Sequence, residues 1–354
     1  MTFLHIGLGV LAVLAAWYAF WQYHSSKLQT SGHVAPETSL FAKLFWTGAC
    51  KLTAFLTIGP VKVVGKENSP RHGRVVYVAN HQVPADFAML AAGSRRHYRA
   101  LGDAAQFTGF FGVLAAWVGI ISVTFKTKED RAAGEAAAVR VLSAPRSGWR
   151  IKYCEGLFAV GLMLVMALYC HLTSDLLFTG VFAALAVWML LMPGGDASLA
   201  VAPQGALMPD NVLKREEFRA GCVRIARAAA EATGEPVHMV PMGIRFKRDP
   251  KDAHWTHRFL KGTRSLFLGL RNPRHWDPLF KLNLDELDAT RRAEVEAHRK
   301  SALAAYYSSH ITIYGGVVVV GKPIDVSTLP EDPMEAIEQV RLAIAALCDE
   351  CEKH

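Results

Sequence analysis

Two long apolar stretches constrain the fold of this chain more than any other feature. Residues 3–23 form one apolar run broken only by His5 and Gln22, and residues 153–192 form two further runs on either side of a polar tip at 171–175. A helix that crosses the hydrocarbon core of a bilayer needs about 20 apolar residues. We therefore expect residues 1–24 to form a transmembrane anchor and residues 153–192 to form an inserted hydrophobic helical hairpin.

Both stretches have a second interpretation. The first could be a cleaved signal peptide, but no basic region precedes it and no clear small-residue cleavage site follows it. The second could be a buried helical pair, although a domain of this size would hardly bury so many apolar residues. Lysines follow the first run and basic residues precede the second, so the positive-inside bias predicts an integral membrane protein with its catalytic domain on the cytoplasmic face.

The composition fits a folded body that carries membrane segments. Of the 354 residues, 51% are hydrophobic but 20% are charged, which is too many for a polytopic transporter. The net charge of +8 predicts an anionic partner. Because the membrane segments are already present, we expect the surface of an anionic membrane and no nucleic acid. Cys348 and Cys351 have the spacing of a metal or redox pair, but the tail offers no fourth ligand, so a helix end is the preferred interpretation.

Short β-type runs alternate with helical stretches from residue 61 onward. This rhythm predicts an α/β fold, with a largely buried sheet flanked by helices. Before it, residues 25–60 include an apolar and aromatic stretch with interspersed lysines at 40–56, which predicts an interfacial helical segment or, alternatively, a core-facing helix. We expect strands at 61–64, 74–78, 120–125, 198–202, 237–242 and 311–320, helices at 128–142 and 216–231, and a catalytic domain over 61–350 that the hairpin interrupts.

Residues 254–282 interleave basic residues with aromatic ones. Such a pattern suits an anionic membrane surface or nucleic acid. Because the chain already carries a predicted anchor, contact with the membrane is the simpler interpretation, and a solvated loop remains the alternative.

The pair most able to carry chemistry is His81 and Asp86. His81 follows the strand expected at 74–78, and Asp86 opens the next apolar stretch. An imidazole at the end of a strand can face a substrate hydroxyl with one nitrogen while a carboxylate one short loop away accepts the N–H of the other. A helix-capping aspartate beside a surface histidine is the structural alternative. Phosphate loops, dinucleotide fingerprints and Gly-x-Ser-x-Gly elbows do not occur, which argues against nucleotide enzymes and serine hydrolases.

The segment 80–86, Asn-His-Gln-Val-Pro-Ala-Asp, has the form NHxxxxD, and three later segments accompany it. They are Gly-Ile-Ile-Ser-Val-Thr-Phe-Lys at 119–126, Ala-Pro-Gln-Gly at 202–205 with Phe-Arg-Ala-Gly at 218–221, and Val-Pro-Met-Gly-Ile at 240–244. In this order they resemble the four motifs of the 1-acylglycerol-3-phosphate acyltransferase family, a family of glycerolipid acyltransferases. The resemblance covers roughly residues 61–326, with 153–192 as an insertion.

The resemblance implies a membrane-bound enzyme that moves a fatty acyl group from an acyl thioester to a hydroxyl of a lysolipid acceptor. The donor would be acyl-CoA or acyl carrier protein, and neither a cofactor nor a metal would be needed. His81 would be the general base and Asp86 its orienting carboxylate. The residues expected to bind substrate are Asn80, Lys126, Gln204, Gly205, Arg219, Pro241 and Met242.

Two departures from the family pattern bear on the acceptor. Gln204 stands where the family has glutamate, and Leu207 stands where it has an arginine that reads phosphate. A guanidinium binds phosphate through two hydrogen bonds and a leucine cannot. Either Lys126, Arg219 or another base takes over, or the acceptor is a lipid without phosphate, such as an amino-lipid or a glycolipid. A non-catalytic membrane-binding protein that retains the fold is the third possibility.

Overall fold

The chain forms two compact units in the computed structural model. The first comprises residues 1–46, 102–134 and 145–196, and the second comprises residues 47–101, 135–144 and 197–354. The boundaries expected from the sequence, at 24, 60 and 350, stay a prediction. The structure describes residues 2–28, 32–35, 47–48, 50–52, 54–55, 58–83, 86–103, 109–124, 127–144, 167, 180, 198–208, 210–253, 272–310 and 313–354.

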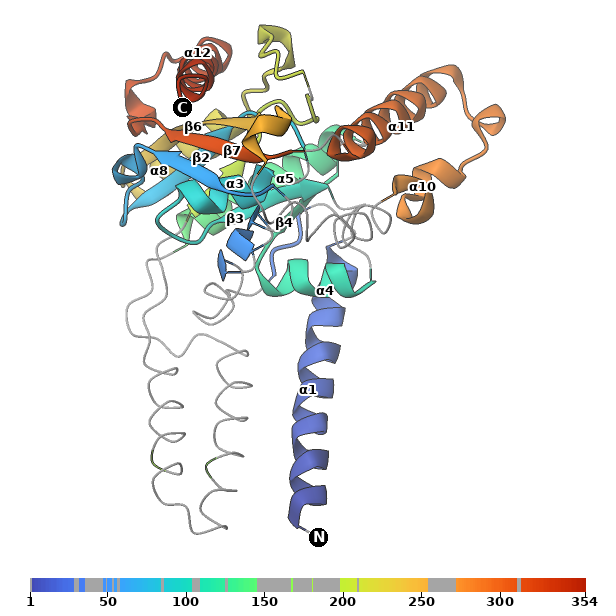
Figure 1. The fold of residues 1–354 in the computed structure, drawn as a ribbon. Coiled ribbons are helices and arrows are strands. Elements are labelled where there is room, and N and C mark those ends of the chain that lie inside the picture. The colour runs from blue at the N-terminus through green and yellow to red at the C-terminus, as the bar shows by residue number, and fades with distance from the viewer. Residues whose placement is uncertain are drawn as a thin grey trace. The chain divides into compact units, whose positions relative to one another are not determined.

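A mixed sheet forms the centre of the second unit (Figure 1). Its strands lie in the order β1-β7-β6-β2-β5-β3, and β8 pairs with β6. The pairs β1–β7, β6–β2, β2–β5 and β5–β3 are parallel, whereas β6 runs antiparallel to both β7 and β8. The expected α/β fold with helices flanking the sheet is thereby confirmed. The strands are β1 Val61–Val64, β2 Arg74–Ala79, β3 Arg99–Asp103, β5 Ser198–Val201, β6 Val237–Lys247, β7 Gly315–Val320 and β8 Ile324–Asp325.

The sequence identified the apolar strands and missed two polar ones. β1, β2, β5 and β6 begin where they were expected, and β7 occupies the second half of the expected strand at 311–320. β3 and β8 were not expected, because the segments Arg-Ala-Leu-Gly-Asp and Ile-Asp lack the apolar run that indicates a strand. Only pairing with a neighbouring strand makes such segments extended.

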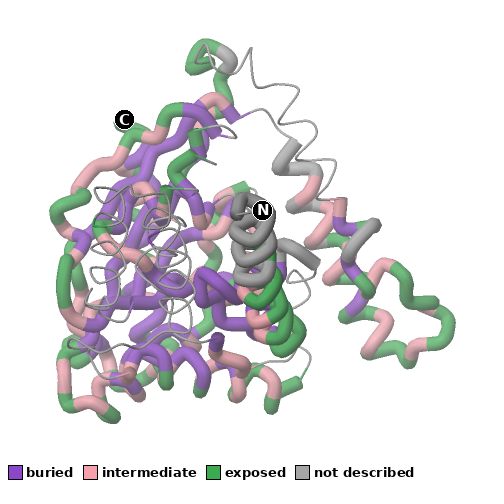
Figure 2. Tube along the Cα trace, turned by 90° about the horizontal axis from the view of Figure 1, so that it is seen from below, coloured by how far each residue is buried: buried purple, intermediate pink, exposed green. Residues whose placement is uncertain are grey.

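Side chains of β7 alternate between two helices, one on each face of the sheet. Val317 and Val319 pack against Cys351 of α12 (Pro333–Cys351). A β-carbon on Gly316 would meet Met89 of α3 (Asp86–Gly93), which lies on the other face. Successive residues of a strand point to opposite faces, so α3 and α12 cover opposite sides of the sheet. Figure 2 shows buried residues gathered in the middle of this unit and exposed ones along its outer turns.

The helices begin and end at residues with capping chemistry. The Asp332 carboxylate accepts hydrogen bonds from the N–H groups of Met334 and Glu335 at the start of α12. The hydroxyl of Thr127 accepts one from the N–H of Asp130 at the start of α5 (Lys128–Ser143), which confirms the helix expected at 128–142. The helix expected at 216–231 is instead a 3-10 turn, Arg215–Glu217, followed by α8 (Gly221–Thr233), which ends at Gly234 with a φ of 65°.

The two cysteines with metal-type spacing lie in the last turns of α12. The thiol of Cys351 donates a hydrogen bond to the carbonyl of Gly243 at 3.4 Å. Burial raises the pKa of Cys348 to about 11 and that of Cys351 to about 12. Both thiols are therefore protonated packing groups near neutral pH, and a metal requires the thiolate. Within the described ranges no group of His, Cys, Asp and Glu could hold a metal ion.

The first unit contains α1 (Thr2–Lys27), α4 (Gly109–Trp117) and β4 (Ile121–Val123). α1 and α4 pack through Trp17 and Trp117, whose rings meet edge to face at 5.4 Å, and through the buried Trp21 and Val113. The side chains of residues 2–10 and 12–14 lie outside the described part of the chain. Among the residues that are described, no helix has both the length and the hydropathy of a membrane span. The transmembrane anchor is thus not confirmed.

Several other expectations fall largely on segments that the structure does not describe. Of the hairpin at 153–192 only residues 167 and 180 are described, and residues 254–271 of the basic and aromatic segment lie outside the described ranges. In the segment 25–60, residues 47–48, 50–52 and 54–55 are helical, with Leu52 and Phe55 exposed. The remaining elements are α10 Pro273–Trp276, α11 Ala289–His310 and the 3-10 turns Lys66–Asn68, Pro250–Asp252, Pro278–Lys281, Leu284–Glu286 and Val326–Thr328.

The close approach of α12 to β6 at Gly243 gives a test of the packing. A β-carbon at Gly243 would lie 2.5 Å from the carbonyl carbon of Leu347, so α12 must move if alanine replaces glycine. We expect Gly243→Ala to lower the free energy of unfolding by about 1–3 kcal/mol, measured by thermal or urea denaturation. Gly316→Ala is the matched control, because its new methyl group meets the flexible end of Met89 most closely and reaches the Arg245 carbonyl only at 3.4 Å. Equal losses in the two variants would contradict this packing.

Candidate active site

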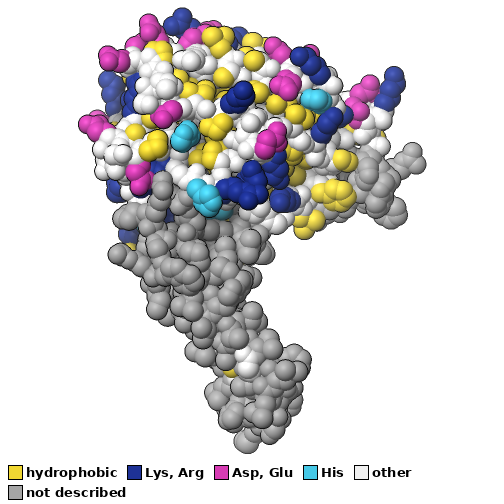
Figure 3. Space-filling model, turned by 90° about the vertical axis from the view of Figure 1, so that its left-hand side faces the viewer, with side chains coloured by type: hydrophobic (Ala, Val, Ile, Leu, Met, Phe, Trp, Pro, Cys, Tyr) yellow, Lys and Arg dark blue, Asp and Glu magenta, His cyan; other side chains and the backbone are white. Residues whose placement is uncertain are grey.

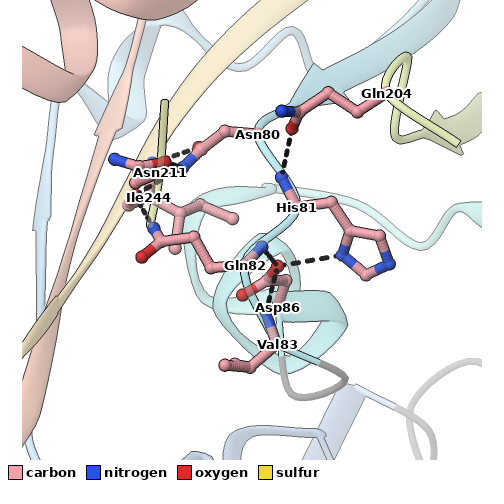
Figure 4. A network of polar contacts seen from close by, with 8 residues as sticks. All are labelled: Asn80, His81, Gln82, Val83, Asp86, Gln204, Asn211 and Ile244. Atoms are coloured by element: carbon pink, nitrogen blue, oxygen red, sulfur yellow. Dashed lines mark hydrogen bonds and ion pairs between the residues drawn. The ribbon is translucent and has the colours of Figure 1, made fainter. Parts of the chain in front are cut away.

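The site lies at the edge of the sheet formed by the carboxyl ends of β2 and β5, beside β6. β2 pairs in parallel with both β5 and β6; β2 and β5 end together at Ala79 and Val201, whereas β6 continues to Lys247. In open α/β sheets this edge is where ligands bind. β2 ends at Ala79, and α3 begins at Asp86. Asn80, His81 and Gln82 therefore leave the sheet in a short connection at this edge (Figure 4).

His81 and Asp86 are in contact. The Nδ1 atom of His81 lies 2.9 Å from Oδ2 of Asp86. The side chain of Asp86 is 3% exposed and that of His81 is 30% exposed. A carboxylate that accepts a hydrogen bond at Nδ1 selects the tautomer with its proton there, which leaves the other nitrogen able to accept a proton. Figure 4 shows that this second nitrogen points away from Asp86.

The Asp86 carboxylate is also held by the backbone of the connection that precedes it. Its Oδ2 atom accepts hydrogen bonds from the N–H of Gln82 at 2.5 Å and of Val83 at 3.2 Å. Burial raises the pKa of the Asp86 carboxyl, and the His81 ring and the two N–H groups oppose this shift without cancelling it. The structural alternative named above, a capping aspartate beside a surface histidine, therefore does not describe this pair, because Asp86 bonds to the His81 ring itself.

Both backbone polar groups of His81 are bonded to the segment 204–211, which we call the 204–211 loop. The Gln204 side chain accepts from the N–H of His81 through Oε1 at 2.9 Å, and the N–H of Met208 donates to the His81 carbonyl at 2.7 Å. The Gln204 side chain is only 2% exposed. In this structure its carbonyl therefore contacts the protein, and its expected binding of substrate stays a prediction.

Asn80 is buried, and both the nitrogen and the oxygen of its side-chain amide form hydrogen bonds. Its Nδ2 donates to the carbonyl of Ile244 at 2.8 Å and to Oδ1 of Asn211 at 2.6 Å, and its Oδ1 accepts from the N–H of Ile244 at 2.8 Å. Gln82 donates to the same Ile244 carbonyl at 2.6 Å. Asn80 is 1% exposed. Its side-chain amide, which was expected to bind substrate, is hydrogen-bonded to protein groups in this structure.

The segment that carries His81 and Asp86 is similar to a known protein family. Residues 60–156 match the family model described as Acyltransferase, a stretch that begins beside β1 and includes both His81 and Asp86. Over these residues the chain is similar to that family. The match supports the predicted resemblance to acyltransferases and the prediction of an enzyme that transfers acyl groups. The catalytic roles of His81 and Asp86 remain a prediction.

A comparison with solved structures gave a similar protein. The chain is similar to the crystal structure of the 1-acyl-sn-glycerophosphate (LPA) acyltransferase, PlsC, from Thermotoga maritima. The identity is 12% and the TM-score is 0.41, over 99% of this chain and 97% of that chain. A comparison with curated protein sequences gave no match.

Gly205 follows Gln204 in the 204–211 loop, and Arg219 lies beside it. Gly205 has a φ of 63°, a left-handed conformation that favours glycine. A β-carbon there would lie 3.6 Å from Nε of Arg219, and the N–H of Arg219 donates to the carbonyl of Pro203 at 3.0 Å. The Arg219 guanidinium is thus placed against the residue that follows Gln204, and the side chain as a whole is exposed.

The three remaining expected site residues are placed differently. Met242 is fully buried on β6, opposite Ala79 of β2, and its sulfur faces the α3 residue Gly93. Pro241 is buried on the same strand, and its carbonyl accepts from Gly321 at 2.9 Å. Lys126 lies outside the described residues. Whether these three contact substrate stays a prediction.

Sequence reasoning missed Gln82, Asn211 and Ile244, which complete the network around Asn80 and His81. Asn211 was detectable only as a turn residue, since it follows Met-Pro-Asp and belongs to a residue type that tolerates positive φ. Ile244 contributes only backbone groups, which carry no signal in a sequence. Its partners lie 162 and 164 residues away, so spacing along the chain could not reveal them.

The raised pKa of Asp86 predicts how stability depends on pH. A carboxyl whose pKa is higher in the folded state binds its proton more tightly when folded, so its contribution to stability falls as the pH rises above the ordinary value of about 3.8. We therefore expect the free energy of unfolding of the wild type, relative to Asp86→Asn, to fall as the pH rises from about 4 to 7. Urea denaturation in detergent at several pH values measures this. A difference that grows with pH would contradict it.

Proposed function

We propose that this acyltransferase moves a fatty acyl group from an acyl thioester, on coenzyme A or acyl carrier protein, to a hydroxyl of a lysophospholipid-like acceptor. His81 acts as the general base and Asp86 as the carboxylate that orients it. The observation that carries the proposal is the contact between His81 Nδ1 and the buried Asp86 carboxylate, which leaves the other ring nitrogen directed away from Asp86 (Figure 4).

The reaction follows from this arrangement. The second ring nitrogen of His81 takes the proton of the acceptor hydroxyl as its oxygen attacks the thioester carbonyl. The Asp86 carboxylate stabilises the imidazolium that forms. When the tetrahedral intermediate collapses, the carbon–sulfur bond breaks and the imidazolium returns the proton to the leaving thiolate. Each turnover thus makes one ester and one thiol without consuming a further reactant.

An acceptor that carries a phosphate is supported by Arg219. Its guanidinium lies against Gly205, one residue from Gln204, which bonds directly to the backbone of His81. A guanidinium binds phosphate through charge-assisted hydrogen bonds. Arg219 is therefore in a position to take the role that Leu207 cannot fill.

A lipid acceptor without phosphate, such as an amino-lipid or a glycolipid, is the second candidate. The observation that favours it is Leu207, which replaces the phosphate-reading arginine of the family pattern. Under this alternative the chemistry of His81 and Asp86 is unchanged and only the acceptor differs. Measuring which acceptor is preferred therefore tests the specificity of the enzyme and not its mechanism.

We also propose that the enzyme works as an integral membrane protein with its catalytic part facing the cytoplasm. The apolar runs at 3–23 and 153–192 and the positive charges beside them support this. Leu52 and Phe55 are exposed beside Lys51, as in a segment that lies at a membrane surface. On the face drawn in Figure 3, several Lys and Arg side chains form a cluster while others are scattered among acidic ones, and such a cluster suits an anionic bilayer.

Substitution at the two central residues tests the chemistry. We expect His81→Ala to lower kcat by about 10²–10⁴-fold, because the base is lost, and Asp86→Asn to lower it by a similar factor, because the ring is no longer oriented by a carboxylate. Release of free thiol from acyl-CoA in the presence of a lysophospholipid in detergent measures the rate.

The matched control is His298→Ala. His298 also contacts a buried carboxylate, that of Asp277 at 2.6 Å, and its side chain is 31% exposed, but it belongs to α11 rather than to the edge of the sheet. We expect this variant to keep its activity. Wild-type rates in His81→Ala would remove His81 as the base.

Acceptor choice is tested with lysophosphatidic acid and monoacylglycerol, which differ in the phosphate. We expect Arg219→Gln to raise the KM for lysophosphatidic acid by about 10–100-fold, the size of a lost charge-assisted hydrogen bond, and to change the rate with monoacylglycerol little. Arg224→Gln is the control, because Arg224 is bonded to Glu135. If the wild type prefers monoacylglycerol, or if Arg219→Gln affects both acceptors equally, a phosphate-bearing acceptor bound by Arg219 is excluded.

A further inference from the structure

The backbone pairing between β2 and β6 stops at Ala79, two residues before His81. The two strands pair in regular register from Arg74 opposite Val237 to Ala79 opposite Met242. At Asn80 the side chain takes over from the backbone: it donates to the carbonyl of Ile244 and accepts from its N–H, both at 2.8 Å. The side-chain amide of Asn80 therefore makes the two hydrogen bonds that the backbone of one further strand residue would make. The backbone itself can then turn away from the sheet at His81.

The Asn80 side chain is in turn held by Asn211. Oδ1 of Asn211 accepts the second N–H of the Asn80 amide at 2.6 Å. Asn211 has a φ of 57°, the left-handed region that asparagine tolerates better than most residues, and it is the one residue other than glycine with positive φ in the described ranges. Its side chain also bonds to Cys348 of α12, so Asn211 is tied to the helix that covers this face of the sheet.

Asn211 also closes the 204–211 loop around His81. The loop bonds to the His81 N–H through Gln204 and to the His81 carbonyl through the N–H of Met208. The N–H of Asn211 donates to the carbonyl of Met208 at 3.0 Å, while its side chain bonds to Asn80. The dipeptide Asn80–His81 is thus held at three points by one loop, and Asn211 supplies the last of them.

We propose that Asn211 is a positioning residue of this acyltransferase: by holding the Asn80 amide against Ile244, it fixes the point at which the chain leaves the sheet and hence the direction of the His81 ring. The inference rests on the proposed function, in which His81 is the base. Without the Asn211 acceptor, a buried N–H of Asn80 has lost its partner, and the amide rotates away from Ile244 to find another. His81 follows directly on Asn80, so its ring moves with that rotation.

Two substitutions at position 211 separate the hydrogen bond from the backbone conformation. Asn211→Gly accepts the left-handed φ but removes the acceptor, whereas Asn211→Asp keeps an acceptor oxygen and is of nearly the same size. We expect Asn211→Gly to lower kcat about tenfold to a hundredfold, the cost of a catalytic group displaced by about 1 Å, with KM within about twofold of the wild type. We expect Asn211→Asp to recover kcat to within about threefold of the wild type.

Asn68→Ala is the control for a general loss of stability. Asn68 likewise bonds a backbone carbonyl across the sheet, that of Val320 at 2.8 Å, but it has no link to His81. We expect its melting temperature to fall as in Asn211→Gly while its kcat stays unchanged. Thiol release from acyl-CoA gives kcat and KM, and thermal denaturation of the same detergent samples gives the melting temperature.

The outcomes distinguish this inference from the proposed function. The inference is overturned if Asn211→Gly keeps kcat within about twofold of the wild type, if Asn211→Asp falls as far as Asn211→Gly, or if KM alone changes, which would assign Asn211 to substrate binding. In each of these cases an inactive His81→Ala variant leaves the proposed function standing. Full activity in His81→Ala overturns the proposed function, whatever the variants at position 211 do.

Discussion

The candidate site depends on one buried carboxylate. Asp86 is almost wholly removed from water, and a single oxygen of its side chain accepts hydrogen bonds from the His81 ring and from the N–H groups of Gln82 and Val83. Burial alone would favour the neutral acid, so these donors are what make a charge tolerable at this position. The same donors fix the carboxylate in space. A ring bonded to it therefore has a defined direction before any substrate arrives.

The sheet supplies the second constraint. β2 and β5 end at one edge beside β6, and each of these three strands contributes something different to the region around His81. β2 delivers the histidine itself, the loop after β5 bonds its backbone through Gln204, and β6 offers the Ile244 backbone to Asn80. β6 packs against both α3 and α12, so the groups that hold the histidine belong to the packed sheet while its ring remains partly exposed. This is how a reactive group can be both accessible and fixed.

The glutamine at position 204 has a physical meaning in this arrangement. Its side-chain carbonyl accepts from the His81 N–H inside the protein, at 2% exposure. A glutamate would offer the same acceptor but would add a second buried negative charge close to Asp86, and burying charges without partners is costly. The amide thus keeps the hydrogen bond without the charge. The departure from the family pattern at this position is compatible with an intact hydrogen bond to His81.

The sequence by itself determined what is local. The NHxxxxD spacing places a histidine and an aspartate five residues apart across the start of a helix, and apolar β-type runs identified β1, β2, β5 and β6, because burial and chain geometry act over a few residues. Only the tertiary structure decided which distant groups hold that pair. Asn80 meets Asn211 across 131 residues and Ile244 across 164, and His81 meets Gln204 across 123. Strand order and helix packing set such contacts, and no spacing along the chain encodes them.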